Sequence, residues 1–243
     1  MEQQVMTYPR EQTLLDPVTA STQRFVDTVR GLSRTDVTGE SLVPPWTRGH
    51  VITHVARAAD SLCRLLFWAG SGFETPQYAS MDARAAEIEA GAIRPVDELA
   101  DDVVQSAERF DTAVRGLAAP AWHQEVRTRT GELRTPASLV SIRLRELEVH
   151  HVDLARGYTC ADVPGEAARW IIEDLVEAQR GRPDTPALRI EATDTGLVLD
   201  LAAGGPTVSG TQAELLGWLT GRASGARLTF SAGGPVPPAP YWI

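Results

Sequence analysis

Apolar residues recur at helical spacing along the first two thirds of the chain and predict four long helices. We expect these helices over residues 16–32, 47–69, 96–117 and 136–157. Between them we expect a loop over 33–46, a short helix over 82–90, and a hairpin or irregular loop over 123–133. Four amphipathic helices with long connections are typical of a four-helix bundle.

The hydrophobic pattern changes after Gly157, where short alternating segments replace the long helical stripes. We expect helices over 164–179 and 212–222, strands over 187–192, 197–201, 207–210 and 227–231, a turn-rich linker at 181–186, and an extended Pro-rich tail over 235–243. The fold class is therefore α+β, with a helical bundle over residues 1–160 and a small α+β domain over 161–243.

The fourth helix contains a conflict between burial and charge. With about 100° between successive residues, Glu146, His150 and Asp153 lie on the same face as Leu139 and Ile142. An apolar stripe of this kind points into a core. A buried carboxylate and imidazole must be paired or must bind a metal ion, since unpaired burial costs several kcal/mol.

Glu146 and His150 have the i, i+4 spacing that lets two side chains project toward one ion. A third ligand must come from another helix, and His54 at the edge of the second helix's apolar stripe is the best candidate. Three protein ligands leave a fourth position open, as in catalytic zinc sites. The alternative is that the Glu-x-x-x-His pair is a surface or capping arrangement.

Other polar residues of the fourth helix have two interpretations. Asp153 either accepts a hydrogen bond from a ligand imidazole or is an ordinary helix-end residue. His151 is expected to face solvent or a neighbouring helix. Glu148 lies nearly opposite Glu146, so we expect it to be exposed.

The remaining histidines and the cysteines are weaker candidates. His50 is interpreted as a capping or surface residue, and His123 as a solvated loop residue. Cys63 lies about 180° around its helix from His54, which excludes it as a ligand. Cys160 lies in a loop and is only a weak candidate.

Composition and charge exclude several classes of protein. The chain has 243 residues, 43% hydrophobic and 23% charged, with a net charge of −9, which disfavours a nucleic-acid partner. The N-terminus does not resemble a signal peptide, and no apolar run reaches the roughly 18 residues of a membrane span. Two cysteines do not make a disulfide framework. We expect a cytoplasmic monomer without a membrane partner.

Three segments resemble the mycothiol-dependent maleylpyruvate isomerase family, within the DinB-like group of metal-binding four-helix bundles. They are Pro45–Ala56 (PWTRGHVITHVA), Arg145–Leu154 (RELEVHHVDL), and the C-terminal Gly221-Arg222 with the tail PPAPYWI. Their order and spacing also fit the family. The resemblance therefore covers nearly the whole chain.

The resemblance implies a ligand set and a reaction. The family's zinc ligands fall on His54, Glu146 and His150, and its active-site arginine falls on Arg222. It implies Zn2+ and mycothiol as cofactors, with the mycothiol thiol in the open zinc position. The thiolate would add to the double bond of maleylpyruvate, a small-molecule substrate, and after rotation its elimination would leave fumarylpyruvate. This isomerase activity belongs to aromatic degradation by the gentisate pathway.

Arg222 also has a structural interpretation, as a cation at the end of the last helix. Two other functions stay open for the whole chain. One is a mycothiol S-transferase that releases the thiol adduct of another electrophile. The other is a non-catalytic, metal-binding regulatory module, which would bind metal without binding a thiol or converting a substrate.

Overall fold

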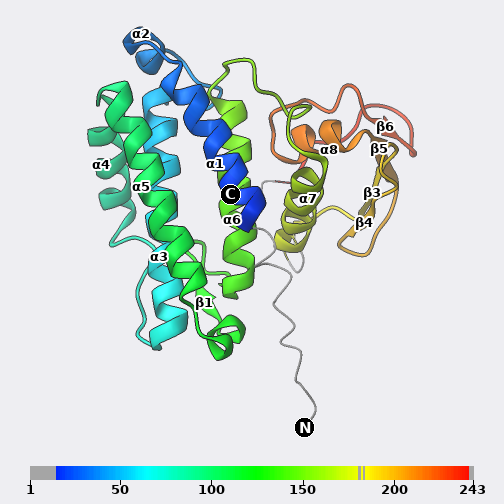
Figure 1. Cartoon of the computed structure of the whole chain (residues 1–243). Helices are drawn as coiled ribbons and strands as arrows, with labels where there is room; N and C mark the ends of the chain where they lie inside the picture. The colour runs from blue at the N-terminus through cyan, green and yellow to red at the C-terminus, as the bar shows by residue number, and fades with distance from the viewer. Residues whose placement is uncertain (1–14, 180–181, 183, 241–243) are drawn as a thin grey trace. The chain divides into compact units, whose positions relative to one another are not determined.

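The computed structural model describes residues 15–179, 182 and 184–240. The chain divides into two compact units, residues 1–156 and 157–243. The first is helical, and the second combines helices with a sheet (Figure 1). The predicted α+β class is confirmed.

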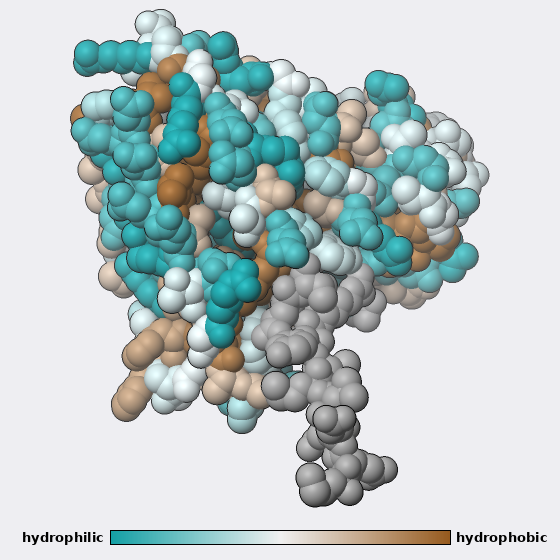
Figure 2. Space-filling model, viewed as in Figure 1, coloured by the Kyte–Doolittle hydropathy of each residue, from teal (hydrophilic) through white to brown (hydrophobic). Residues whose placement is uncertain are grey.

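Four long helices among the described residues build the first unit. They are α1 (Leu15–Arg30), α3 (Arg48–Ser71), α5 (Val96–Arg115) and α6 (Pro136–Asp153). Helix α3 packs against both α5 and α6, and α1 packs against the same two helices. Figure 2 shows polar residues over the outer faces of α1 and α5, with apolar residues in the seam between them. This is the bundle that the periodicity predicts.

Local signals set the ends of these helices. Thr47 is the N-cap of α3, and its backbone N–H donates to Nδ1 of His50 at 3.2 Å, as the capping interpretation of His50 expects. Gly72, with φ of 76°, ends α3 in the left-handed conformation that glycine adopts without a Cβ clash. Along α5, buried Leu99, Val103, Phe110 and Val114 follow the helical period.

The connections differ from the prediction in one place. The segment 33–46 is not all loop, because α2 (Arg34–Thr38) begins at Ser33, whose hydroxyl accepts from the N–H of Asp36 at 3.1 Å. The Asp36 carboxylate accepts from the Ser33 N–H in return, which completes a capping box. The short helix is present as α4 (Met81–Ala92). The hairpin alternative is also present, as β1 (Val126–Arg127) and β2 (Leu133–Arg134) after the 3-10 helix η2 (Ala119–His123).

The second unit holds a four-stranded sheet among its described residues. Its order is β4 (Val198–Leu201), β3 (Leu188–Ala192), β5 (Thr207–Gly210) and β6 (Thr229–Phe230), with β3 and β5 parallel and the other pairs antiparallel. Helices α7 (Gly165–Gln179) and α8 (Gln212–Leu219) pack against each other and against the sheet (Figure 1). The predicted strands are all present.

Helix α8 is shorter than predicted. It ends at Leu219 rather than at residue 222, because Gly221 adopts a φ of 72° and the N–H of Arg222 turns back to the Gly217 carbonyl at 2.8 Å. Residues 235–240 of the Pro-rich tail have no regular secondary structure, whereas 241–243 lie outside the described residues, as do parts of the predicted linker. None of the described helices is long and apolar enough to cross a membrane.

Candidate metal centre

Two helices of the first unit bring the three predicted ligands together. His54 lies on α3, and Glu146 and His150 lie one turn apart on α6. Oε2 of Glu146 is 3.1 Å from Nε2 of His54 and 3.2 Å from Nε2 of His150. One donor atom from each residue lies within 4.8 Å of the others. Tetrahedral zinc with bonds of about 2.0 Å separates its ligand atoms by about 3.3 Å, so the cluster has the size of such a site.

The donor atoms are close together but do not satisfy one another. Oε2 of Glu146 and Nε2 of His150 are buried without a correctly oriented hydrogen-bond partner among the described residues. Leaving such atoms unpaired costs about 1–3 kcal/mol each. A cation between them would satisfy both. The Glu146 side chain as a whole is 15% exposed, although its Oε2 atom is buried.

Asp153 orients one of the imidazoles. Its Oδ2 lies 2.7 Å from Nδ1 of His150, and Asp153 is fully buried. A carboxylate there accepts a hydrogen bond from Nδ1–H and leaves the lone pair of His150 Nε2 available to a cation placed between it and Glu146. Asp153 is therefore a hydrogen-bond partner of the His150 imidazole, as the first of its two interpretations expects.

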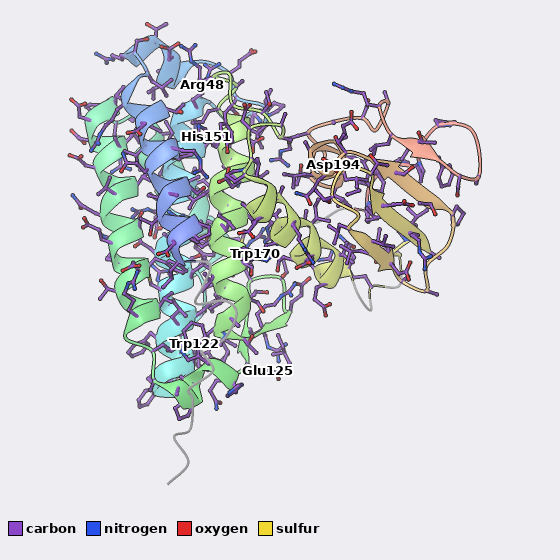
Figure 3. All side chains as sticks on the ribbon, turned by 45° about the vertical axis from the view of Figure 1, so that its right-hand side comes forward. Arg48, Trp122, Glu125, His151, Trp170 and Asp194 are labelled. Carbon is purple, nitrogen blue, oxygen red and sulfur yellow. The ribbon has the colours of Figure 1, made fainter. Side chains whose placement is uncertain are left out.

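The first residue of α3 and the loop before it bind the end of α6 that carries this cluster. Nε of Arg48 donates to the Leu154 carbonyl at 2.5 Å, and the Leu42 N–H donates to the Asp153 carbonyl at 3.0 Å. Figure 3 shows Arg48 at the same end of the bundle as His151 of α6. These bonds satisfy carbonyls that a helix C-terminus leaves unpaired. The Arg48 bond also ties α3 to the end of α6, the two helices that carry the cluster residues.

Burial and charge shift the pKa of all three residues. Burial lowers the pKa of His54 to about 4, with Glu146 offsetting only part of the effect. Burial also opposes protonation of His150, but Asp153 and Glu146 outweigh it and raise its pKa to about 9. Burial opposes ionisation of Glu146 as well, but the two imidazoles hold its pKa well below the ordinary value. The carboxylates of Glu146 and Asp153 together carry two negative charges. A divalent cation bound by neutral imidazoles would balance them.

Comparisons with known proteins identify the family of the chain. Residues 18–155 match the family model described as the mycothiol maleylpyruvate isomerase N-terminal domain. The chain belongs to this family. A solved structure of the mycothiol-dependent maleylpyruvate isomerase is similar, with a TM-score of 0.82 and 30% identity, over 96% of this chain and 97% of that one. A histidine-to-alanine mutant of the isomerase gives a TM-score of 0.81 and 29% identity, with the same coverage. A comparison with curated protein sequences finds no match.

One sequence prediction about this family member's fourth helix is wrong. Glu148 is fully buried rather than exposed, because α6 has neighbours on more than one side. Its Oε1 accepts from Arg24 of α1 at 2.5 Å. His151 faces the same neighbouring helix, where Nε2 lies 2.8 Å from Oγ1 of Thr28 and the ring packs edge-on against Phe25. Both residues therefore belong to the α1–α6 contact.

Among the described residues, the cluster consists of His54, Glu146 and His150 and does not include the other candidate residues. His123 is exposed on η2, as expected. Burial raises the pKa of the Cys63 thiol to about 11, so it is a poor ligand near neutral pH. Cys160 and Arg222 lie in the second unit. Nη1 of Arg222 donates to the Thr220 carbonyl at 2.5 Å.

Sequence reasoning missed one residue beside the cluster. Arg84 of α4 places Nη2 3.2 Å from Nδ1 of His54. The sequence gives no signal for it, because the predicted short helix contains no other candidate chemistry. Only the packing of α4 against α3 brings Arg84 to His54.

Proposed function

We propose that this protein is a zinc- and mycothiol-dependent cis–trans isomerase that converts maleylpyruvate to fumarylpyruvate. The observation that carries the proposal is the convergence of one donor atom each from His54, Glu146 and His150 within 4.8 Å. Membership of the mycothiol maleylpyruvate isomerase family supports the choice of thiol and substrate.

The three residues fit zinc by donor type, spacing and burial. Two imidazoles and one carboxylate make a common catalytic ligand set that leaves a fourth position open. Zinc bound there would supply the positive charge that favours the thiolate form of a thiol near neutral pH. Asp153 keeps the His150 proton on Nδ1, and Trp46, whose ring centroid lies 5.3 Å from that of His54, shields that imidazole from water.

Arg222 is proposed to hold a substrate carboxylate or to stabilise the enolate that forms when the thiolate adds. It follows α8 in the second unit, where its backbone N–H bonds to the Gly217 carbonyl. The competing role is purely structural, at the end of that helix. Arg222→Ala with full zinc content and an unchanged rate would remove this residue from the proposed mechanism.

Zinc analysis and a thiol-dependent isomerisation assay test the proposal together. Wild-type protein is expected to hold one zinc ion and to form fumarylpyruvate from maleylpyruvate only when mycothiol is present. His54→Ala and Glu146→Ala each remove a ligand, so both are expected to lose zinc. Their activity should fall on the order of a hundredfold or more, because losing a ligand exceeds the 10- to 100-fold effect of losing a ligand's supporting partner.

His123→Ala is the matched control, since it removes an exposed histidine from η2. It should keep wild-type zinc content and rate. Consumption of mycothiol in proportion to product would contradict isomerisation and favour the S-transferase alternative. Zinc binding without thiol affinity or turnover would favour the regulatory module instead.

A further inference from the structure

Arg84 lies beside the metal cluster with its guanidinium fixed by two aromatic rings. Its Cζ lies over the ring of Trp46 at 5.7 Å from the centroid, and over the ring of Tyr78 at 5.6 Å. Cation–π contacts and the planar shape of the group restrict its orientation. Nη2 then reaches to 3.2 Å from Nδ1 of His54.

One edge of this guanidinium has an unused donor. Nε of Arg84 is buried and has no hydrogen-bond partner among the described residues. The Nε–H and Nη2–H groups share one edge of the planar fork, and their spacing matches the two oxygens of a carboxylate. A buried N–H without an acceptor is costly, so this edge is suited to an acceptor supplied by a ligand.

Metal binding at His54 would add a third donor at the same place. This step rests on the proposed function. Nε2 of His54 faces Glu146 at 3.1 Å and is the atom that would hold the cation. A neutral imidazole that binds a metal through Nε2 carries its proton on Nδ1. Nδ1–H and the Arg84 Nη2–H are then both donors and cannot satisfy each other, whereas one carboxylate oxygen can accept from both.

We propose that Arg84 and Nδ1–H of His54 form a carboxylate-binding subsite next to the metal cluster, and that Arg84 selects electrophiles bearing a carboxylate close to the reacting carbons. Trp46 and Tyr78 hold the guanidinium in place for this role. The subsite favours dicarboxylate and keto-acid substrates. A neutral electrophile would leave all three N–H groups without an acceptor.

Calorimetric titration of the zinc-loaded, full-length protein with maleate tests the subsite without turnover. Arg84→Gln is expected to lower maleate affinity by about tenfold or more, because it removes a charged, two-point contact. Arg84→Lys keeps the positive charge but loses the planar, two-point guanidinium. Its maleate affinity should therefore lie between those of the wild type and Arg84→Gln. Arg30→Gln removes an equal charge from an exposed position on α1 and should bind maleate like the wild type.

Equal maleate affinity in the wild type and Arg84→Gln, or no maleate binding by the zinc-loaded wild type, would overturn the subsite. Loss of zinc from both Arg84 variants would also overturn it, since Arg84 would then support the metal rather than a carboxylate. Zinc content and isomerisation are measured on the same preparations. A wild type that binds maleate through Arg84 but does not isomerise maleylpyruvate would refute the proposed function and leave the subsite standing.

Discussion

Asp153→Asn tests whether the buried carboxylate on α6 orients His150 for a metal ion. Asparagine has nearly the same size, and its amide oxygen can still accept from Nδ1 across the 2.7 Å contact. The substitution removes the negative charge that makes this bond strong and His150 more basic. Because Asp153 is fully buried, water cannot replace the lost charge.

We expect zinc affinity to fall by about 10- to 100-fold, which is about 1.4–2.7 kcal/mol, the usual loss when the partner of a metal-binding histidine is removed. Competition with a chromophoric chelator measures the affinity, and circular dichroism confirms the fold. Asp97→Asn removes a carboxylate from the exposed first turn of α5 and should leave zinc affinity unchanged. Wild-type zinc affinity in a folded Asp153→Asn protein would refute the role given to Asp153.

Two further substitutions and one alkylation measurement test the packing of the first unit. Arg24→Ala leaves the buried Glu148 carboxylate without its 2.5 Å ion pair and is expected to lower the free energy of unfolding by about 2–3 kcal/mol in urea denaturation. Gly49→Ala places a Cβ 2.0 Å from the Ala92 carbonyl oxygen, so α3 and α4 must separate, and we expect a loss of about 2 kcal/mol or more by the same measurement. The Cys63 thiol, with its pKa raised to about 11 by burial, should be alkylated at pH 8 tens of times more slowly in the folded than in the unfolded protein.

Each of these experiments has a matched control or background. Arg30→Ala removes an exposed ion pair at 3.9 Å on the same helix as Arg24 and should cost less than about 0.5 kcal/mol. Gly70→Ala meets only a flexible leucine methyl group at 3.4 Å and should be neutral or stabilising, since alanine favours the helix. Alkylation is followed in a Cys160→Ser background, so that Cys63 is the only thiol. Equal effects within a pair, or equal alkylation rates, would contradict the packing described.

Helix positions could be predicted because their signals are local. The inner face of α5 and the caps of α3 are set by residues a few positions apart, and the predicted helices lie within a few residues of the observed ones. Helix α2 was also predictable in principle, since Ser33 and Asp36 have the three-residue spacing of a capping box. A segment of only five helical residues, however, carries too little periodicity to stand out from a loop.

Tertiary neighbours could not be predicted in the same way. The short helix α4 approaches α3 so closely that a Cβ on Gly91 would lie 2.3 Å from Cγ2 of Thr53, and this contact brings Arg84 to His54. No spacing within α4 indicates which helix it packs against. The convergence of His54 with Glu146 was expected because both lie on apolar stripes, and a bundle core forces such stripes to face one another.

Glu148 shows why a single apolar stripe describes α6 poorly. Glu146 and Glu148 point about 200° apart around the helix axis, so they face different neighbours. Glu148 pairs with Arg24 of α1, while Glu146 lies against His54 of α3. Turning α6 about its axis would bury both carboxylates away from their partners, at a cost of several kcal/mol for each. The ion pair on the α1 side therefore favours the rotation of α6 at which Glu146 and His150 meet His54, so zinc affinity should also fall in folded Arg24→Ala protein.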